Sequence, residues 1–417
     1  MATPLIPISR KQGMWFVFFL VLYEFLTYIA NDMIMPGMIT VVQQFHAQES
    51  TVATSLVFYI LGGASLQLFL GPLSDSFGRR PLMILGAFLF FVFTILIACS
   101  NSMNQFLTAR FFQGMGLCFI GVIGYATIQE IFAEMDAIRL IAIMANASVL
   151  APLLGPLLGA IVIHYATWRL IFIIIAVFAL FALWGLWRFM PEPIGKTKKN
   201  GELIPRIPFS AKPIIKNYKD LLTDPTFCFG AIATGLVGIP CVAWIALAPV
   251  ILISQAKLTV IQYGLWQLPI FGTTIFGNWV LYQLTYKYQL KQIILLGGII
   301  ISIGLIFSAL LPYWFGNDYL YMLPGIIIYF FGLSIVTAPL NRFCLFITPV
   351  SKGTASAVLS LSVMLIGALG IEIANIFYTN HYNLYFGLYC NVIGALFLLC
   401  IGLTFKFDKI SNGVAKP

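Results

Sequence analysis

Two acidic residues stand inside an otherwise apolar stretch near the start of the chain. The stretch LVLYEFLTYIANDMIMPGM, residues 20–38, contains Glu24 and Asp32 and no basic residue. On a helix with about 100° per residue, Tyr28 and Asn31 lie on the same face as the two acids. These four residues form a polar stripe about 100° wide. Such a stripe predicts a helix that lines a watery cavity with one face, where the carboxyl groups could bind protons or cations.

The composition places this helix in a membrane. Hydrophobic residues make up 60% of the 417 residues and charged residues only 9%, whereas a soluble domain is about 25% charged. A soluble protein of this composition would lack the polar residues that cover a surface in water. We therefore interpret the chain as an integral membrane protein.

Twelve apolar runs of about 20 residues predict twelve membrane-spanning helices. One polar, basic stretch separates the first six from the last six, which predicts an N-terminal bundle over 1–189, a cytoplasmic linker over 190–222 and a C-terminal bundle over 223–417. The runs are 14–38, 51–70, 81–99, 105–128, 138–163, 168–189, 227–251, 260–286, 291–313, 319–347, 354–379 and 383–405.

The distribution of basic residues predicts the orientation. If both termini are cytoplasmic, most of the 23 Lys and Arg residues fall on the cytoplasmic side, as the positive-inside rule requires. The net charge of +9 is then explained by the orientation of the chain in the membrane and by attraction of its basic residues to anionic lipid. We therefore expect membrane lipid as a partner and no nucleic acid.

The predicted depth of the charged residues bears on their role. Glu24 lies about ten residues, or roughly 15 Å, inside its span, near the middle of the bilayer. An exposed acid there costs on the order of 2.5–3.5 kcal/mol, which suggests a function. Asp32 and Arg110 both lie roughly 9 Å from the outer end of their spans, so we predict a network that joins them. The alternative for each acid is a structural hydrogen bond between helices.

Other chemistry has no sequence pattern to support it. The seven cysteines lie within predicted spans and the three histidines lie at outer helix ends, so neither type predicts a metal or redox site. The chain contains no G-x-x-x-x-G-K-[ST], H-E-x-x-H or G-x-S-x-G motif. We expect no cofactor and no enzymatic activity, and a transporter driven by an ion gradient is the leading hypothesis.

Two glycine-containing motifs are more specific. The loop GPLSDSFGRRP, residues 71–81, follows the second predicted span. In it, Gly71 and Gly78 permit a tight turn, Asp75 can cap or pair, and Arg79 and Arg80 offer cations to helix ends.

The second motif is APLLGPLLG, residues 151–159 of the fifth predicted span. Gly155 and Gly159 have the spacing that lets two helix backbones approach closely. Pro152 and Pro156 predict kinks in the same helix.

These stretches resemble the major facilitator superfamily. The loop matches its G-x-L-x-D-x-x-G-R-[KR] pattern, although Ser76 replaces a basic residue that is often found there. LTARFFQGMG, residues 107–116, resembles the fourth-helix motif around an arginine, here Arg110. APLLGPLLG resembles the fifth-helix signature of drug/proton antiporters with twelve spans, and the first-helix stretch is most similar to MdfA-type multidrug/proton antiporters.

The resemblance implies an all-α membrane protein with the major facilitator fold. Two six-helix bundles would surround a central cavity that opens alternately to each side of a bacterial inner membrane. Glu24 and Asp32 would couple proton binding to drug binding with the support of Arg110. The resemblance further implies a cytoplasmic gate loop of Gly71, Asp75, Gly78, Arg79 and Arg80, and an antiporter motif of Pro152, Gly155, Pro156 and Gly159 that limits proton leak.

The implied function is export of diverse lipophilic drugs, cationic and neutral, by a monomer that the proton gradient drives. Low-dielectric surroundings favour the neutral form of a carboxylic acid, so a cationic drug would compete with the proton. The expected substrate-binding residues are Glu24, Tyr28, Asn31, Asp32, Leu236 and Ile239.

Two other hypotheses remain open. A carrier of the same fold could export or import a single metabolite, such as a siderophore or sugar, in a proton-coupled manner. A membrane-embedded enzyme or passive channel is the third hypothesis, which proton-gradient dependence of transport would exclude.

Overall fold

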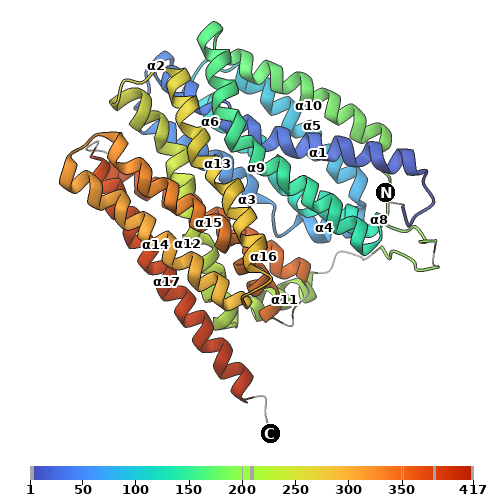
Figure 1. Cartoon of the computed structure of the whole chain (residues 1–417). Helices are drawn as coiled ribbons and strands as arrows, with labels where there is room; N and C mark the ends of the chain where they lie inside the picture. Colours follow the sequence, from blue (N-terminus) through green and yellow to red (C-terminus); the bar gives the residue numbers. More distant parts are fainter. Residues whose placement is uncertain are drawn as a thin grey trace. The chain divides into compact units, whose positions relative to one another are not determined.

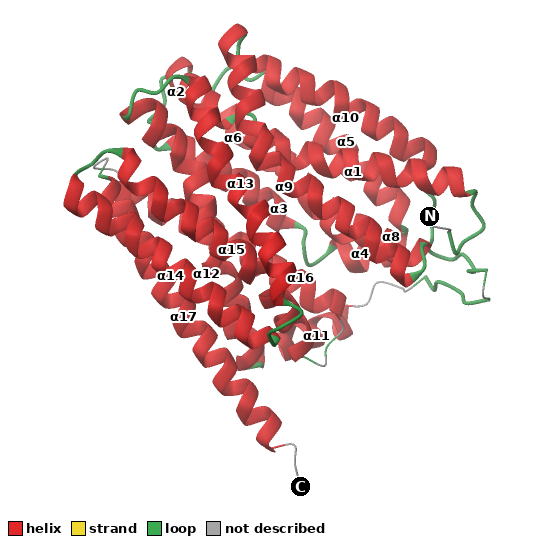
Figure 2. Cartoon of the chain, in the orientation of Figure 1, coloured by secondary structure: helices red, strands yellow, loops and turns green. Residues whose placement is uncertain are grey.

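The computed structural model describes residues 4–199, 201–206, 211–348, 350, 352–378 and 382–414. These residues form helices and loops, and their only β-type pairings are two isolated bridges (Figures 1 and 2). A helix or a run of joined helices covers each of the twelve predicted ranges. The prediction of an all-α protein is confirmed.

Most of these helices could cross a bilayer. Nine helices of the described residues are long and apolar enough to span a membrane. The number is ten if α3 (Thr51–Ser65) and α4 (Leu70–Phe77), which are bent by 46°, form one span. Two predicted spans fall outside this set. In α9 (Glu134–Tyr165), the apolar part that the structure describes, Leu150–Tyr165, is shorter. The helix α13 (Val260–Leu284) contains several polar residues, including Gln262, Gln267 and Asn278. The protein is a multi-pass membrane protein.

The chain divides into two compact units, each described here by itself. The first comprises Met1–Ala47 and Phe58–Ile214, and the second comprises Gln48–Val57 and Ile215–Pro417. The helices that begin in residues 1–210 are α1 Arg10–Asp32, η1 Met35–Gly37, α2 Met38–Gln44, α3 Thr51–Ser65, α4 Leu70–Phe77, α5 Arg79–Ala98, α6 Met103–Gly114, α7 Gly116–Phe119, η2 Ile120–Gly124, α8 Tyr125–Ile131, α9 Glu134–Tyr165 and α10 Arg169–Phe189.

The first unit packs around α1, which lies against α9 and α10 (Figure 1). The hydroxyl of Ser9 accepts a hydrogen bond from the backbone N–H of Gln12, so α1 begins earlier than the apolar run predicts. At its other end, Pro36 cannot donate a backbone hydrogen bond, and the chain passes through η1 before it continues in α2. The first predicted span is therefore longer than 14–38 and is broken near its end.

The second unit is built from α11 Ala211–Thr223, α12 Pro225–Ala248, η3 Pro249–Gln255, α13 Val260–Leu284, α14 Leu290–Phe315, α15 Tyr319–Ile347, α16 Lys352–Phe377 and α17 Asn383–Val414. Within it, α12 packs against α16 and α17, and α14 packs against α15 and α17. The helix α11 occupies the end of the predicted cytoplasmic linker.

Candidate functional site

The polar stripe of α1 is buried in the first unit. The side chain of Glu24 is 1% exposed and that of Asp32 is 5% exposed. Asn31 is also buried, and Tyr28 is half-buried. Burial of two acids without an adjacent lysine or arginine on the same helix is costly unless other groups stabilise them.

Arg110 of α6 reaches Asp32 through Asn31. Its Nη2 donates a hydrogen bond of 2.6 Å to Asn31 Oδ1. The Nδ2 of Asn31 in turn donates to Asp32 Oδ1 at 3.3 Å. Arg110 is completely buried, and this relay brings its charge close to the carboxylate without direct contact. The structure therefore brings three of the predicted site residues together in one network.

The network continues from Arg110 into α5. The Nη1 of Arg110 donates to Gln113 Oε1 at 2.8 Å, and Gln113 Nε2 donates to Thr94 Oγ1 at 2.8 Å. The guanidinium also lies 4.3 Å from the ring centroid of Tyr59, whose hydroxyl donates to the backbone carbonyl of Thr27. These contacts hold the arginine fork in one orientation, so it presents Nη2 to α1.

Glu24 has a separate partner. The hydroxyl of Tyr125, the first residue of α8, donates a hydrogen bond of 2.7 Å to Glu24 Oε1. The other carboxyl oxygen, Oε2, is buried and has no hydrogen-bond partner among the described residues. A short π-helix, η2, directly precedes Tyr125, and π-helical turns are frequent at functional sites. Glu24 therefore offers one unsatisfied acceptor to a proton or a ligand.

The glycines of the antiporter motif lie against the end of the polar stripe. A Cβ atom at Gly155 would lie 2.6 Å from Asp32 Cβ, and one at Gly159 would lie 1.9 Å from the carbonyl oxygen of Met33. The backbones of α9 and α1 thus meet where Asp32 is held, in agreement with the close approach that the spacing predicts. The helix α9 continues through Pro152 and Pro156.

Replacement of Gly159 by alanine should disrupt this seam. Because the new methyl group would overlap a backbone carbonyl, the helices must separate, and we expect a loss of about 1–3 kcal/mol in the free energy of unfolding. Thermal unfolding of the purified protein measures the effect. Gly402→Ala is the matched control, because a Cβ there has open space. Equal stability of the two variants would contradict a tight seam.

The predicted gate loop forms a compact charged cluster at the start of α5. Arg79 Nη2 forms ion pairs with Asp75 Oδ1 at 2.6 Å and with Glu130 Oε1 at 2.7 Å, and its Nη1 donates to Ser74 Oγ. The tight turn forms at Gly78, whose φ of +107° suits glycine. The prediction of a turn at Gly71 is wrong, since Gly71 lies in the first turn of α4.

Glu192, which follows α10, caps the start of α5. Its Oε1 and Oε2 accept hydrogen bonds of 3.0 Å from the backbone N–H groups of Arg79 and Arg80. A carboxylate at this position satisfies two amides that have no partner within the helix and complements the helix dipole. A Cβ at Gly78 would lie 2.5 Å from Glu192 Oε2, so glycine is also required for this contact. The loop is thus held to the chain segment that follows the sixth predicted span.

Glu192→Ala should destabilise the protein and loosen the loop. Loss of a helix cap costs about 0.5–2 kcal/mol, which thermal unfolding detects. The control is Glu202→Ala, whose carboxylate is exposed and pairs with Lys198 at 2.9 Å; exposed pairs contribute about 0–1 kcal/mol. Equal losses of stability in the two variants would contradict the role of Glu192 as a cap.

The two predicted site residues of the second unit differ in exposure. Leu236 is half-buried. Ile239 is buried, and its side chain fills the space beside Gly370 of α16. On α12 the buried Trp244 donates to Gln267 Oε1 of α13 at 3.0 Å. This hydrogen bond joins the two helices.

Four partners of the site carry no signal in the sequence that identifies them. Gln113, Thr94 and Tyr125 carry no charge, and their distance from α1 in the sequence gives no sign of contact. Glu192 was visible as an acid beside a span, but its role depends on the backbone geometry of α5. In the part of the chain that the structure describes, no group of three or more His, Cys, Asp or Glu residues could hold a metal ion.

Comparison with known proteins identifies the family. The family model described as Major Facilitator Superfamily matches residues 20–371. The chain belongs to the Major Facilitator Superfamily. It is therefore a member of a transporter family, as its helices and the loop at residues 71–81 indicated.

Individual relatives within the superfamily are similar over their whole length. The chain is 42% identical over 411 residues to "Multidrug transporter MdfA" of Yersinia pestis bv. Antiqua (strain Angola), covering 98% of each chain. It is also 42% identical to the protein of the same name from Escherichia coli O6:H1, covering 96% of each chain.

Solved structures support the fold alone. The structure of a D-xylose-proton symporter has a TM-score of 0.75 with this chain at 15% sequence identity. The match covers 95% of this chain and 98% of the symporter. A bacterial homolog of the human lysosomal transporter Spinster, in an inward-facing conformation, has a TM-score of 0.73 at 14% identity, covering 96% and 98%.

Proposed function

We propose that the protein exports structurally diverse lipophilic drugs, cationic and neutral, in exchange for protons. It would act in a bacterial inner membrane with both termini in the cytoplasm, by alternating access. The observation that carries the proposal is the buried pair of acids on α1 in a chain that is 42% identical to multidrug transporters. The relatives support the range of substrates, and the acids supply groups that can exchange a proton for a cation.

The two acids differ in their surroundings, which supports different roles. Asp32 is connected through Asn31 to the permanent charge of Arg110, so a change in its protonation alters a network that extends to α5. One carboxyl oxygen of Glu24 accepts a hydrogen bond from the hydroxyl of Tyr125, and the other has no hydrogen-bond partner among the described residues. In the proposal, Asp32 carries the coupling proton, and Glu24 is the main contact for a cationic drug.

The transport cycle follows from competition for these carboxyl groups. A bound cation favours the charged carboxylate, whereas a proton neutralises it, so each ligand reduces the affinity for the other. Alternating exposure to the two sides then links drug exit to proton entry. The cluster of Arg79, Asp75 and Glu130 would open and close the cytoplasmic side as the gate. No cofactor is required because the proton gradient drives the cycle.

Transport by inverted membrane vesicles tests the proposal. We expect uptake of one cationic and one neutral compound when a proton gradient is imposed, and loss of both when an ionophore dissipates it. Uptake of only one metabolite from a panel of unrelated compounds would favour a dedicated carrier. Gradient-independent uptake would refute proton coupling and favour a passive pathway.

A further inference from the structure

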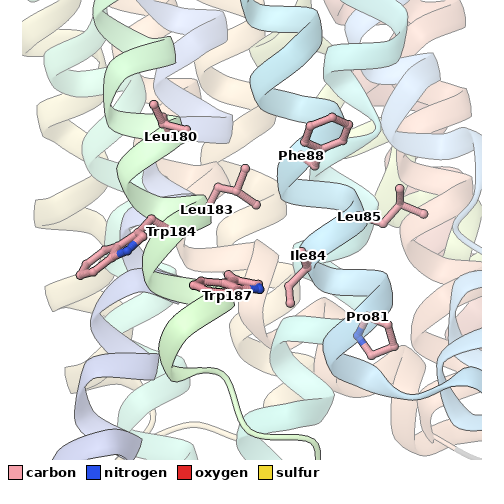
Figure 3. A pocket seen from close by; sticks show the side chains of 8 residues that line it. All are labelled: Pro81, Ile84, Leu85, Phe88, Leu180, Leu183, Trp184 and Trp187. Atoms are coloured by element: carbon pink, nitrogen blue, oxygen red, sulfur yellow. The ribbon is translucent and has the colours of Figure 1, made fainter.

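An apolar groove lies between α5 and α10 on the surface of the first unit. It has a volume of about 530 Å³, and the two helices pack side by side along it. Leu183 and Trp187 of α10 point toward α5, and Ile84 of α5 points toward α10 (Figure 3). The lining residues are Pro81, Ile84, Leu85, Phe88, Leu180, Leu183, Trp184 and Trp187.

The position of the groove suits the boundary between headgroups and hydrocarbon. Its lining extends over about seven residues of each helix, or roughly 10 Å, which is about a third of the hydrocarbon core. Trp184 and Trp187 lie toward one end of it and are exposed. Tryptophan is enriched at the membrane interface, so this end lies near the headgroups and the other extends toward the bilayer centre.

Two cations, Arg80 and Arg188, lie at the tryptophan end, and we call them the basic rim. Arg80 Nη2 donates to the carbonyl oxygen of Trp187 at 2.7 Å, and the Arg188 guanidinium lies 5.6 Å from the ring centroid of Phe189. The start of α1 joins them there, because Gln12 Nε2 donates to the Phe189 carbonyl.

The basic rim has no acidic partner in the described part of the chain. The nearby acids are engaged elsewhere: Asp75 and Glu130 bind Arg79, and Glu192 binds the backbone of α5. The Nε of Arg80 also has no hydrogen-bond partner among the described residues. An apolar groove that ends in unpaired cations complements a molecule with an apolar chain and an anionic head.

We propose that this groove binds one anionic phospholipid, with an acyl chain between α5 and α10 and its phosphate against the basic rim. Each cation near the membrane surface strengthens binding of an anionic headgroup by about fivefold. A zwitterionic phospholipid carries the same chains and phosphate but also a compensating amine, so it binds more weakly. The site lies beside Arg80 of the gate loop, which gives the lipid a direct contact with that loop.

Native mass spectrometry of the full chain in detergent tests the proposal, with added phosphatidylglycerol or phosphatidylethanolamine. We expect the protein to retain one phosphatidylglycerol molecule at concentrations where phosphatidylethanolamine is lost. Leu183→Trp, which fills the groove, should remove the retained lipid. Arg188→Gln, a surface change that leaves the packing intact, should weaken its binding by about fivefold.

Arg342→Gln is the matched control, because Arg342 is also an exposed arginine stacked 4.8 Å from a phenylalanine ring, in the second unit. It should retain the lipid as the unaltered protein does. Full retention by Leu183→Trp, equal binding of the two phospholipids, or an equal loss in Arg342→Gln would each overturn the proposal. These measurements record binding alone, so they do not depend on the transport function.

Discussion

Glu24→Gln should abolish export of cationic drugs while export of neutral drugs continues. Glutamine keeps the size of the side chain and can still accept the hydrogen bond from Tyr125, but it cannot carry a negative charge. A cationic drug would lose a charge-assisted contact of about 1.5–3 kcal/mol, or roughly 10- to 150-fold in affinity. A neutral drug loses little, since Asp32 still exchanges the coupling proton.

This difference is measured by growth inhibition and by proton-driven efflux. Both assays use one cationic and one neutral compound, at matched protein levels. Glu372→Gln is the control, because it removes a half-buried acid from another membrane-spanning helix and should leave cation export intact. Addition of Asp32→Asn to Glu24→Gln should impair export of both compounds. Equal loss of both in Glu24→Gln alone would refute the separate roles of the two acids and favour a structural role for Glu24.

Arg110→Lys should abolish export of both compounds and destabilise the protein. Lysine keeps the charge, but one ammonium group cannot reproduce the fork that bonds to Asn31 and Gln113 while it stacks on Tyr59. Loss of one hydrogen bond to a buried charge costs about 1.5–3 kcal/mol. The link between Asp32 and α5 would also be cut. Thermal unfolding and efflux of both compounds measure the two effects.

Arg169→Lys provides a matched comparison. Arg169 also stacks on an aromatic ring, 4.4 Å from the Trp168 centroid, and donates to Gln44 and to the carbonyl oxygen of Ser100, but it is only half-buried. Its replacement should cost less stability and leave efflux intact. If Arg110→Lys behaves like Arg169→Lys, the relay to Asp32 has no part in transport.

The fold could be predicted from the sequence because an apolar run of about 20 residues has the length of a helix that crosses the bilayer. Few other structures are compatible with such a run. The polar stripe of α1 was equally visible, since helical periodicity places Glu24 and Asp32 on one face whatever surrounds them. Matched depth suggested that Arg110 and Asp32 share a network. The identity of the bridge, Asn31, and the extension through Gln113 depend on the rotation of α6, which no periodic pattern records.

Contacts made by backbone geometry were the least predictable. Glu192 caps α5 because two amide groups and the turn at Gly78 come together in space, and no spacing in the sequence encodes that meeting. The start of α1 and the end of its span also differ from the apolar run, because the Ser9 cap and Pro36 act locally. A hydropathy profile averages over many residues, so it does not detect the effect of a single cap or a single proline.

The π-helix η2 makes the partner of Glu24 depend on the exact length of α6–α8. A π turn accommodates one residue more than an α turn. Removal of one residue from Ile120–Gly124 would restore regular α geometry and rotate the helix that follows by about 100° relative to the helix before it. Tyr125 would then leave Glu24, although every side chain near the acid was unchanged. A one-residue deletion in this short segment therefore acts as a register change, which separates Tyr125 from Glu24 without a substitution at either residue.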